Sequence, residues 1–434
     1  MSKLGWDSLG TSFDCTCGLV HRLPIRVCHI GTNAAARLAA FARAECGSSC
    51  LVVSDENTHR AAGDKLLSAL SRAGKTVREQ VYGPEPLDAT AELAEEVKRL
   101  GAEADFFVAI GAGTLSDLAK YAGDKLKRPV LLYPTAASMN GYTSGIVALK
   151  VRGLKRTLPC APAIGVFADP QVVATAPQRM TAAGVGDFLS KCSSSSDWRA
   201  AHFLRGGYYC ERPREFFEGV QDRLLSVVAH VGQGNVEAVG LVLEALLLSG
   251  LSMVVAGSSA PASGGEHLIS HYLDMKHALY GTPNDLHGSQ VGVGTVYCLG
   301  LWERVLAFEL NEIEIKSLLD AQPSEEDIQS DIERDWGAVS EEVWQQWKEK
   351  SLTRDALREE LGRFQRGLPE LRAALHRDLL PSATVASAIE AAGGPSNPEG
   401  LNVPVLEYQN ALRGARYLRN RFTILDLAAE LGAA

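Results

Sequence analysis

Short apolar runs alternate with helix-period segments over the first 170 residues of the chain. The runs are rich in β-branched or aromatic residues and are bounded by Gly, Pro, Asp or Asn, which is typical of buried strands. We expect strands at Val27–Ile30, Leu51–Ser54, Phe106–Ile110, Val130–Tyr133 and Ile164–Ala168. Helix-period segments lie between them, at Ala34–Ala44, Ala61–Ala73 and Thr90–Leu100. This alternation predicts an α/β domain with a mostly parallel, Rossmann-like sheet.

From about residue 171 the strand signal disappears and the pattern becomes helical. Helices are expected at Gln178–Cys192, Trp198–Leu204, Phe216–His230, Val236–Ala256 and over most of 301–434. We therefore predict an α/β domain over residues 1–170 and an all-helical domain over 171–434, with ligands in the cleft between them. The longest apolar run, near Val239–Gly257, is interrupted by Glu244 and is shorter than the ~20 residues of a membrane crossing. It predicts a core helix and no membrane span.

Composition and charge exclude some classes of function. The 434 residues are 46% hydrophobic and 22% charged, as in an ordinary soluble globular protein. The net charge of −9 argues against general binding to nucleic acid or anionic membranes, because both need a basic surface. The amino terminus lacks the apolar segment of a signal peptide, and nine scattered cysteines indicate reduced thiols in a cytoplasmic protein.

One cysteine spacing stands apart from that scatter. Cys15 and Cys17 are separated by a single residue, and His21 follows nearby. Such a group fits either a metal site or a loop with two ordinary thiols. The spacing alone leaves both interpretations open.

A glycine turn follows the strand at Phe106–Ile110 and opens a helix. Its sequence is Gly111-Ala-Gly-Thr-Leu-Ser-Asp117. Small residues let backbone N–H groups approach a diphosphate, and a helix N-terminus adds positive partial charge. The third glycine of a dinucleotide fingerprint falls at Ser116, so the pattern also fits a plain strand-to-helix turn capped by Ser116 or Asp117.

Two further predicted strands end in polar side chains. Asp55 follows the strand at Leu51–Ser54, where its carboxylate fits either an adenosine ribose or a helix cap. An array of hydroxyls, including Thr135 and Ser138, follows the strand that ends at Tyr133. Loops of this kind, at the carboxyl ends of strands, are what an open α/β sheet presents to its ligand.

Histidines and one carboxylate in the helical half suggest a metal site. His267 and His271 are four residues apart and share one face of a predicted helix. His287 opens a glycine-rich segment, and Asp187 stands at an apparent helix start. Two imidazoles, one carboxylate and a vacant position suit catalytic Zn²⁺, Fe²⁺ or Ni²⁺, although surface histidines fit the same spacing.

Taken in chain order, these segments resemble one family, the sn-glycerol-1-phosphate dehydrogenases. They belong to the superfamily of dehydroquinate synthase and the iron-containing alcohol dehydrogenases. The matching motifs are Gly111–Asp117, Pro134–Ser138, Gly141–Ser144, Ala168–Pro170, Gly184–Asp187, Gly265–His271 and His287–Gly288. The resemblance covers about residues 25–300 and is strongest to the bacterial branch, around Lys155–Thr157 and Arg179–Trp198.

The resemblance implies a fold, an activity and site residues. The fold is an α/β domain followed by an all-α domain, and the activity is reduction of dihydroxyacetone phosphate to sn-glycerol-1-phosphate with NAD(H) or NADP(H), in a homodimer. Asp187, His267 and His287 would hold one divalent metal (Zn²⁺, Ni²⁺ or Fe²⁺), and His271 would lie near the substrate. Gly111, Ala112, Gly113, Thr114 and Leu115 would bind the cofactor diphosphate, Thr135, Ser138 and Ser144 the nicotinamide half, and Asp55 the adenosine ribose.

The residues suit ketone reduction, with one departure. A metal would polarise the ketone oxygen, the cofactor would carry the hydride, and Asp187 and His271 are the candidate catalytic residues. Lys155 and Arg156 are candidates for the substrate phosphate, or else a solvated pair in a loop. Asn140 stands where the family usually has an Asp that contacts substrate, so a related phosphorylated ketone or polyol also fits.

Two alternative functions use the same motifs. One is a non-redox lyase or cyclase with metal and NAD, as in dehydroquinate synthase. The other is a catalytically silent binding homologue, suggested by Asn140 and the acidic helical tail. Net consumption of NAD(P)H with dihydroxyacetone phosphate distinguishes the dehydrogenase from both.

Overall fold

A computed structural model describes residues 3–83, 87–151, 154–310 and 313–434 of the chain. Its contacts divide the protein into two compact units, each made of separate stretches of chain. The first unit comprises Met1–Phe188, Glu211–Ser259 and Ala391–Gly394. The second comprises Leu189–Cys210, Ala260–Glu390 and Pro395–Ala434. The units therefore follow spatial contacts rather than order along the chain.

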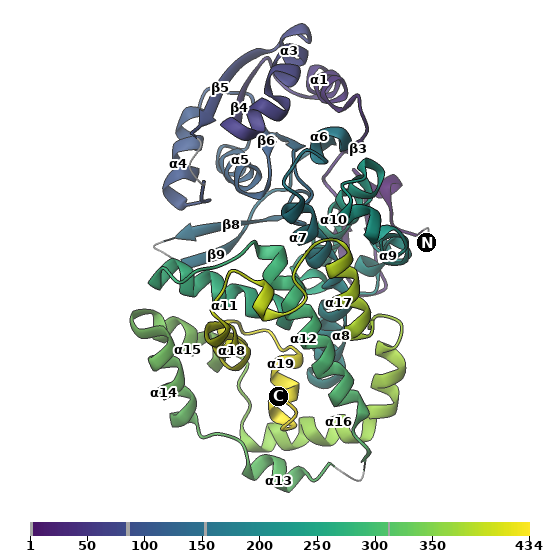
Figure 1. Cartoon of the computed structure of the whole chain (residues 1–434), viewed down its shortest axis with the longest axis vertical. Helices are drawn as coiled ribbons and strands as arrows, with labels where there is room; N and C mark the ends of the chain where they lie inside the picture. The colour runs from purple at the N-terminus through teal and green to yellow at the C-terminus, as the bar shows by residue number, and fades with distance from the viewer. Residues whose placement is uncertain (1–2, 84–86, 152–153, 311–312) are drawn as a thin grey trace. The chain divides into compact units, whose positions relative to one another are not determined.

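The first unit is built on a six-stranded sheet in which every pair of neighbours is parallel (Figure 1). The strand order is β3-β10-β7-β6-β4-β5. Its strands are β3 (Val27–Ile30), β4 (Ser49–Asp55), β5 (Thr76–Tyr82), β6 (Phe106–Gly111), β7 (Val130–Pro134) and β10 (Gly165–Ala168). The predicted parallel sheet is confirmed, and all five predicted strands are present within a few residues.

Helices cover both faces of this sheet (Figure 1). On one face, Leu38 of α1 (Ala34–Glu45) and Leu66 of α3 (Asp64–Arg72) share a buried cluster with Phe106. On the other, Phe107 packs against Gly101 and Gly123, where α4 (Ala91–Leu100) and α5 (Gly113–Leu126) approach the sheet. The first unit contains η1 (Trp6–Ser8), α1 (Ala34–Glu45), α2 (Glu56–Thr58), η2 (His59–Gly63), α3 (Asp64–Arg72), α4 (Ala91–Leu100), α5 (Gly113–Leu126), α6 (Pro170–Val173), most of α7 (Gln178–Leu189), η3 (Arg212–Phe216), α9 (Val220–Gly232) and α10 (Val236–Ala256).

Five strands were not expected from the sequence. β5 pairs only with β4 at the sheet edge, and its mixed polar pattern lacks the apolar run of a central strand. The others form two antiparallel hairpins: β1 (Ser12–Asp14) with β2 (Val20–Arg22), and β8 (Ile146–Val151) with β9 (Leu154–Pro159). The loop interpretation of Lys155 and Arg156 is therefore wrong, because both belong to β9.

The longest apolar helix, α10, is a core helix of the first unit. It is long and apolar enough to cross a membrane by length and composition, but 83% of its most apolar window is buried inside the protein. The predicted core helix is confirmed. Although α10 comes from the helical half of the sequence, its contacts place it with the parallel sheet.

Helices make up the second unit, and its described residues contain no strand. These helices are α8 (Lys191–Arg205), η4 (Ala260–Ala262), α11 (Gly265–Tyr280), α12 (His287–Ala307), α13 (Ile315–Asp320), α14 (Glu325–Trp336), η6 (Gly337–Val339), α15 (Ser340–Lys348), α16 (Arg354–Leu375), most of α17 (Ser382–Ala391), η7 (Pro398–Gly400), α18 (Val405–Gly414), η8 (Ala415–Leu418) and α19 (Ile424–Glu430). Trp302 of α12, Trp336 of α14 and Phe364 of α16 share one buried cluster. The tail after residue 300 therefore completes the core on which α11 and α12 rest.

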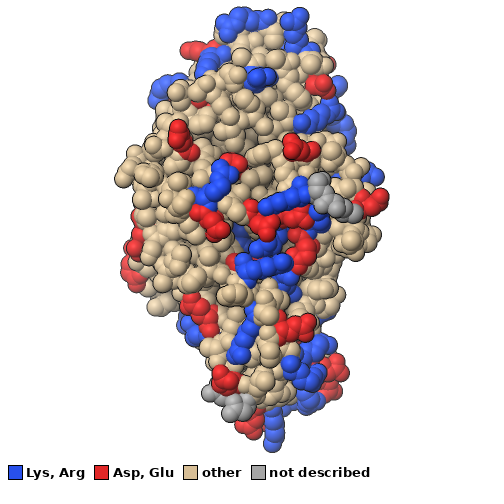
Figure 2. All heavy atoms as spheres, turned by 90° about the vertical axis from the view of Figure 1, so that its right-hand side faces the viewer, with Lys and Arg blue, Asp and Glu red and all other residues tan. Residues whose placement is uncertain are grey.

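Acidic and basic side chains are interspersed on the face drawn in Figure 2. Among the described residues of that face, neither sign forms a continuous field. The net charge of −9 thus coexists with local basic groups.

Candidate functional site

The amino-terminal end of α5 has the features expected of a phosphate-binding turn. Its N-cap is Ala112, and no described side chain caps its first turn. The two alternative caps have other partners: the Ser116 hydroxyl donates to Ala112 O at 2.8 Å, and Asp117 Oδ2 accepts from Ala148 N at 2.9 Å. A Cβ on Gly111 would come within 2.3 Å of the Leu115 side chain, so the turn also needs its glycine for packing. The first-turn N–H groups are thus available to an anion.

Asp55 acts as a helix cap in this structure. Its Oδ1 accepts from Thr58 N at 2.8 Å, and its own backbone N–H donates to Thr58 Oγ1 at 3.0 Å. This reciprocal pair forms a capping box at the start of α2. The cap interpretation is confirmed, and the ribose contact stays a prediction.

A buried lysine that the sequence analysis missed organises the loop after β7. Lys120 is fully buried and donates to Gly141 O and Ile146 O, both at 2.7 Å. It also donates to Ser144 O at 3.3 Å and Ser144 Oγ at 3.2 Å. Ser144 therefore has a structural role beside its predicted contact with nicotinamide. The helical position of Lys120, three residues after Asp117, was the available signal.

Asn140 holds the carboxylate of Asp187. The Asn140 backbone N–H donates to Asp187 Oδ2 at 3.1 Å, and its side-chain amide donates to Asp187 Oδ1 at 3.2 Å and to Ser249 Oγ at 3.3 Å. Asp187 itself is fully buried. A neutral amide in this place can donate to a carboxylate, which an ionised Asp cannot.

Asp187 lies in the last turn of α7, so the expected helix start at this residue is wrong. The glycines before it serve packing rather than helix termination. A Cβ on Gly184 would lie 1.9 Å from Ala137 O, closer than any real contact. The missing side chain lets α7 approach the loop after β7 and brings Asp187 to Asn140.

Three imidazoles converge in the second unit. His267 and His271 lie on α11 as predicted, and His287 begins α12. The centroids of the rings are 5.3 Å apart for His267 and His287, 6.0 Å for His271 and His287, and 6.2 Å for His267 and His271. Their convergence argues against the alternative that His267 and His271 are ordinary surface histidines.

Polar side chains orient two of these rings. His267 Nδ1 lies 2.9 Å from Glu266 Oε1, and His287 Nδ1 lies 2.9 Å from Ser270 Oγ. Because Nδ1 is engaged in both rings, coordination of a metal would use Nε2. A carboxylate or hydroxyl behind a histidine is the usual support of a metal-binding imidazole.

Two buried carboxylates, Asp197 and Glu266, fix the start of α11. Asp197 accepts from Gly265 N at 2.8 Å, Trp302 Nε1 at 3.1 Å and Ile424 N at 3.1 Å. Glu266 accepts from Gly264 N at 2.7 Å. Burial raises the pKa of both carboxyl groups, and the neighbouring Glu266 raises that of Asp197 further. Asp197 and Glu266 lie within two of the motifs that carry the resemblance, but the sequence alone predicted no role for either.

The predicted site residues are divided between the units. Asp187 and the predicted cofactor residues belong to the first unit, and His267, His271 and His287 belong to the second. Arg156 is half-buried in β9, and the side chain of Lys155 lies outside the described residues.

Comparisons with known proteins agree with this picture. The family model of the iron-containing alcohol dehydrogenases matches residues 29–177. The glycerol-1-phosphate dehydrogenase (NAD(P)+) of Bacillus licheniformis is 32% identical over 356 residues, which cover 80% of this chain and 87% of that protein. The enzyme of the same name from Bacillus velezensis is 31% identical, with 93% and 91% covered.

Solved structures show the same fold at low identity. An alcohol dehydrogenase from Oenococcus oeni superposes with a TM-score of 0.59 at 16% identity, covering 94% of this chain and 98% of that one. Glycerol dehydrogenase from Schizosaccharomyces pombe gives a TM-score of 0.56 at 19% identity, with 81% and 91% covered. These likenesses confirm the predicted fold class.

Proposed function

The chain belongs to the glycerol-1-phosphate dehydrogenase family, and from this membership we propose that it reduces dihydroxyacetone phosphate to sn-glycerol-1-phosphate with NADH or NADPH. The convergence of three imidazoles, two of them backed by Glu266 and Ser270, is the observation that carries the proposal. It is the arrangement expected of a metal site rather than of a packed core.

The first unit would bind the nicotinamide cofactor. The turn at Gly111 and Ala112 and the uncapped start of α5, as far as Leu115, would accept the diphosphate on their N–H groups. Thr135, Ser138 and Ser144 would meet the nicotinamide half, and Asp55 the adenosine ribose. The cap made by Asp55 uses Oδ1, so a ribose contact would fall to Oδ2.

Asp187, His267 and His287 would hold one divalent metal, for which their carboxylate and imidazole donors are suited. Such a metal supplies polarisation of a ketone oxygen when bound. Asn140 would keep Asp187 oriented through its two hydrogen bonds. His271, the third imidazole of the cluster, would transfer the proton that the reduced ketone oxygen needs near neutral pH.

The substrate phosphate would meet basic side chains of the β8–β9 hairpin. Lys155 and Arg156 are adjacent in β9, and a guanidinium suits paired hydrogen bonds to phosphate. We propose that Asn140 positions Asp187 through its N–H groups and that its side-chain oxygen accepts a hydrogen bond from a substrate hydroxyl rather than a proton. This assignment keeps dihydroxyacetone phosphate as the expected substrate despite the departure from the family's Asp.

Absorbance of NADH and NADPH tests the reaction directly. We expect net oxidation of either cofactor with dihydroxyacetone phosphate and little with unphosphorylated dihydroxyacetone. Turnover without net oxidation would support the cyclase or lyase alternative. A protein without metal and without turnover of any phosphorylated ketone would support the silent homologue.

Substitution of a ligand tests the metal assignment. His267→Ala should abolish activity and remove metal while the circular dichroism spectrum is kept. His277→Ala is the matched control on the same helix, because its Nδ1 pairs with Thr282 O at 2.7 Å, away from the three-histidine cluster. Full metal occupancy in His267→Ala would defeat the ligand assignment.

We also propose a cytoplasmic homodimer with no membrane span and no nucleic-acid partner. The net charge of −9 and the burial of α10 support this environment. Sedimentation equilibrium measures the oligomeric state, and a single monomeric species would contradict the dimer.

A further inference from the structure

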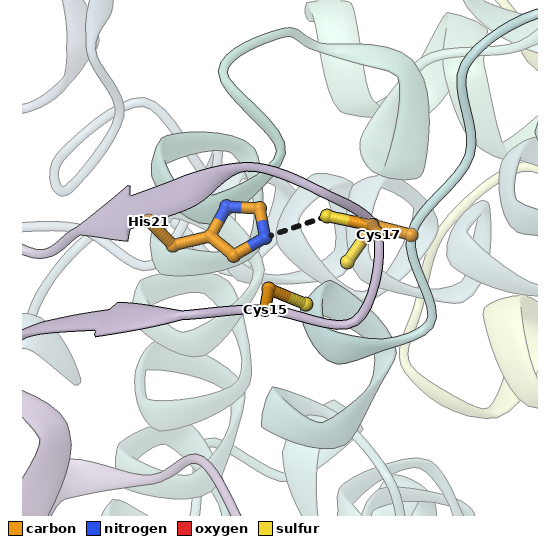
Figure 3. Close-up of side chains that lie close together, drawn as sticks. Cys15, Cys17 and His21 are labelled. Atoms are coloured by element: carbon orange, nitrogen blue, oxygen red, sulfur yellow. Dashed lines mark hydrogen bonds between the residues drawn. The ribbon is translucent and has the colours of Figure 1, made fainter.

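Two groups of polar side chains lie apart from the residues assigned to catalysis. The first is at the tip of the β1–β2 hairpin, where Cys17 Sγ lies 3.2 Å from His21 Nε2, with Cys15 beside them (Figure 3). A contact between a thiol and an imidazole forms with or without a metal, so both interpretations of the Cys15–Cys17 spacing stay predictions. The second group lies in the second unit and borders a cavity.

This cavity has a volume of about 390 Å³, which is within the usual range for small-molecule sites. All the residues that line it belong to the second unit, so it depends on no particular arrangement of the two units. Arg205 comes from α8, and the others come from the tail after residue 300, between α13 and α19. The cavity is therefore a feature of the helical tail.

Part of the lining is apolar. Leu319, Ile328, Trp347 and Leu357 line the cavity, and all four are buried. An indole and three aliphatic side chains offer a ligand an apolar contact surface. A bare inorganic ion would leave this surface in contact with water. The lining therefore suits a ligand that has an apolar body.

The lining also includes members of a buried charge network. The Arg205 guanidinium donates to Glu360 Oε2 at 2.7 Å and to Glu430 Oε1 at 3.1 Å. Lys350 is only 8% exposed, and its Nζ lies 2.7 Å from Asp426 Oδ1. Buried charges are tolerated when they are paired in this way. Both of these cations thus already have carboxylate partners.

Arg416 is the cation of this network that lacks a hydrogen-bonded carboxylate. Its Nε lies 3.6 Å from Asp426 Oδ1, which is too far for a hydrogen bond, and none of its nitrogens donates to an acceptor among the described residues. Its side chain is 15% exposed and lines the cavity. A guanidinium presents its N–H donors in a planar fork that matches a carboxylate. Arg416 therefore brings an unused donor fork to the cavity.

The charge balance of the network favours a ligand with a single negative charge. The network contains three cations and three carboxyl groups: Arg205, Lys350, Arg416, Glu360, Asp426 and Glu430. The two other charged residues of the lining have partners outside it: Arg354 with Asp320, and Glu325 with Lys348. Burial, and then the neighbouring Glu360, raise the pKa of Glu430, with Arg205 opposing. The protonated form of Glu430 leaves the network one negative charge short. A carboxylate supplies that charge, whereas a phosphate monoester carries about 1.5–2 negative charges near pH 7 and would be repelled more strongly by Asp426.

We propose that this cavity binds a small organic carboxylate, whose anionic head pairs with the Arg416 guanidinium and whose apolar body lies against Trp347. No residue of the lining is among those assigned to the metal, the cofactor or the substrate, so the site is independent of the proposed reaction. A ligand that binds only the folded state stabilises it. An occupied cavity would therefore stabilise the helical tail, whose core supports α11 and α12.

Benzoate is the probe for this site, and benzamide is its neutral control of nearly the same shape. Isothermal titration calorimetry of the full-length protein should show saturable binding of benzoate, at least tenfold tighter than benzamide, because the amide cannot form the ion pair. Binding should persist in His267→Ala, which separates the cavity from the proposed metal site. Absence of benzoate binding, equal affinity for benzamide, tighter binding of inorganic phosphate, or loss of binding in His267→Ala would overturn the proposal.

Arg416→Gln removes the charge that pairs with the ligand. It should weaken the binding of benzoate about tenfold or more, as expected for the loss of hydrogen bonds to a charged group. Arg413→Gln is the matched control, because Arg413 is exposed on α18 and lies outside the lining. Equal Kd values for benzoate in the two variants would overturn the proposal.

Tryptophan fluorescence tests the site without changing the charge network, in case Arg416→Gln does not fold. Benzoate should alter the fluorescence of the wild type. Trp347→Phe should lose most of this change while calorimetry still shows binding. Trp344→Phe is the control, since Trp344 lies on the same helix but outside the lining. A fluorescence change that survives in Trp347→Phe would place the ligand elsewhere and overturn the proposal.

Discussion

The two units support their functional groups in different ways. In the first unit, the loop after β7 is shaped by close backbone approach at Gly184 and by one buried ammonium, that of Lys120. In the second unit, the start of α11 is held by the buried carboxylates of Asp197 and Glu266. Steric fit therefore governs the predicted cofactor side, whereas charge and protonation govern the histidine cluster. A change of size should damage the first unit most, and an isosteric change of charge the second.

Gly184→Ala is expected to have the largest effect on stability. The added Cβ would lie 1.9 Å from Ala137 O, so α7 must move away from the loop. Overpacking of this kind costs roughly 3 kcal/mol. Gly240→Ala is the matched helical control, because its Cβ would meet Pro170 at an ordinary 3.5 Å. Helix propensity should make that control more stable by about 1 kcal/mol. Equal urea midpoints for the two variants would contradict the steric account.

Lys120→Met keeps an unbranched side chain, one atom shorter, but removes the donor. The carbonyls of Gly141, Ser144 and Ile146 would lose their buried partner. Unsatisfied buried groups cost about 1–3 kcal/mol, and the loosened loop should raise the KM for NAD(P)H. Lys125→Met serves as control, since Lys125 is exposed on the same helix. The unfolding midpoint and the KM for NAD(P)H are measured for both variants. Equal changes in the two variants would show that Lys120 does not shape the loop.

Glu266→Gln changes charge with almost no change of size. Replacing the carboxylate behind His267 should weaken metal binding about tenfold, the lower end for a supporting group of this kind. Titration with a competing chelator measures the change in Kd. The exposed Glu303 of α12 provides the control substitution to Gln. If Glu266→Gln binds metal as tightly as wild type, the charge of Glu266 does not govern the histidine cluster of the second unit.

Glu430→Gln should have the smallest effect and show it only through pH. Burial, and then the neighbouring Glu360, raise the pKa of Glu430 well above its ordinary value of 4.5, with Arg205 opposing. The folded state therefore holds the proton more tightly than the unfolded state. Stability should fall as pH rises from about 4.5 toward the raised folded value, by at most about 1.4 kcal/mol per pH unit.

The variant removes that decline, so its stability relative to wild type should increase as pH rises through this window. Glu399→Gln, at an exposed position, should leave the slope unchanged. Unfolding by urea at several pH values measures both. A wild-type profile parallel to that of Glu430→Gln would show that Glu430 does not titrate as proposed.

Local patterns of sequence were sufficient for the central strands, the glycine turn before α5 and the pair His267 and His271. These features depend on residues that are neighbours in the chain or one helical turn apart. The edge strand β5 was missed because it pairs on one side only and lacks an apolar run. The helix start expected at Asp187 was wrong because a glycine serves helix packing as readily as helix termination.

By itself, the sequence determined the α/β order, the family and the identity of the candidate ligands, since motifs and periodicity are written along the chain. Only the tertiary structure decided that α10 belongs with the sheet and that Asn140 holds Asp187. The physical reason is separation along the chain: Asp197 and Ile424, which share a hydrogen bond, are 227 positions apart. No local propensity specifies such a pair, because packing of the whole chain selects it.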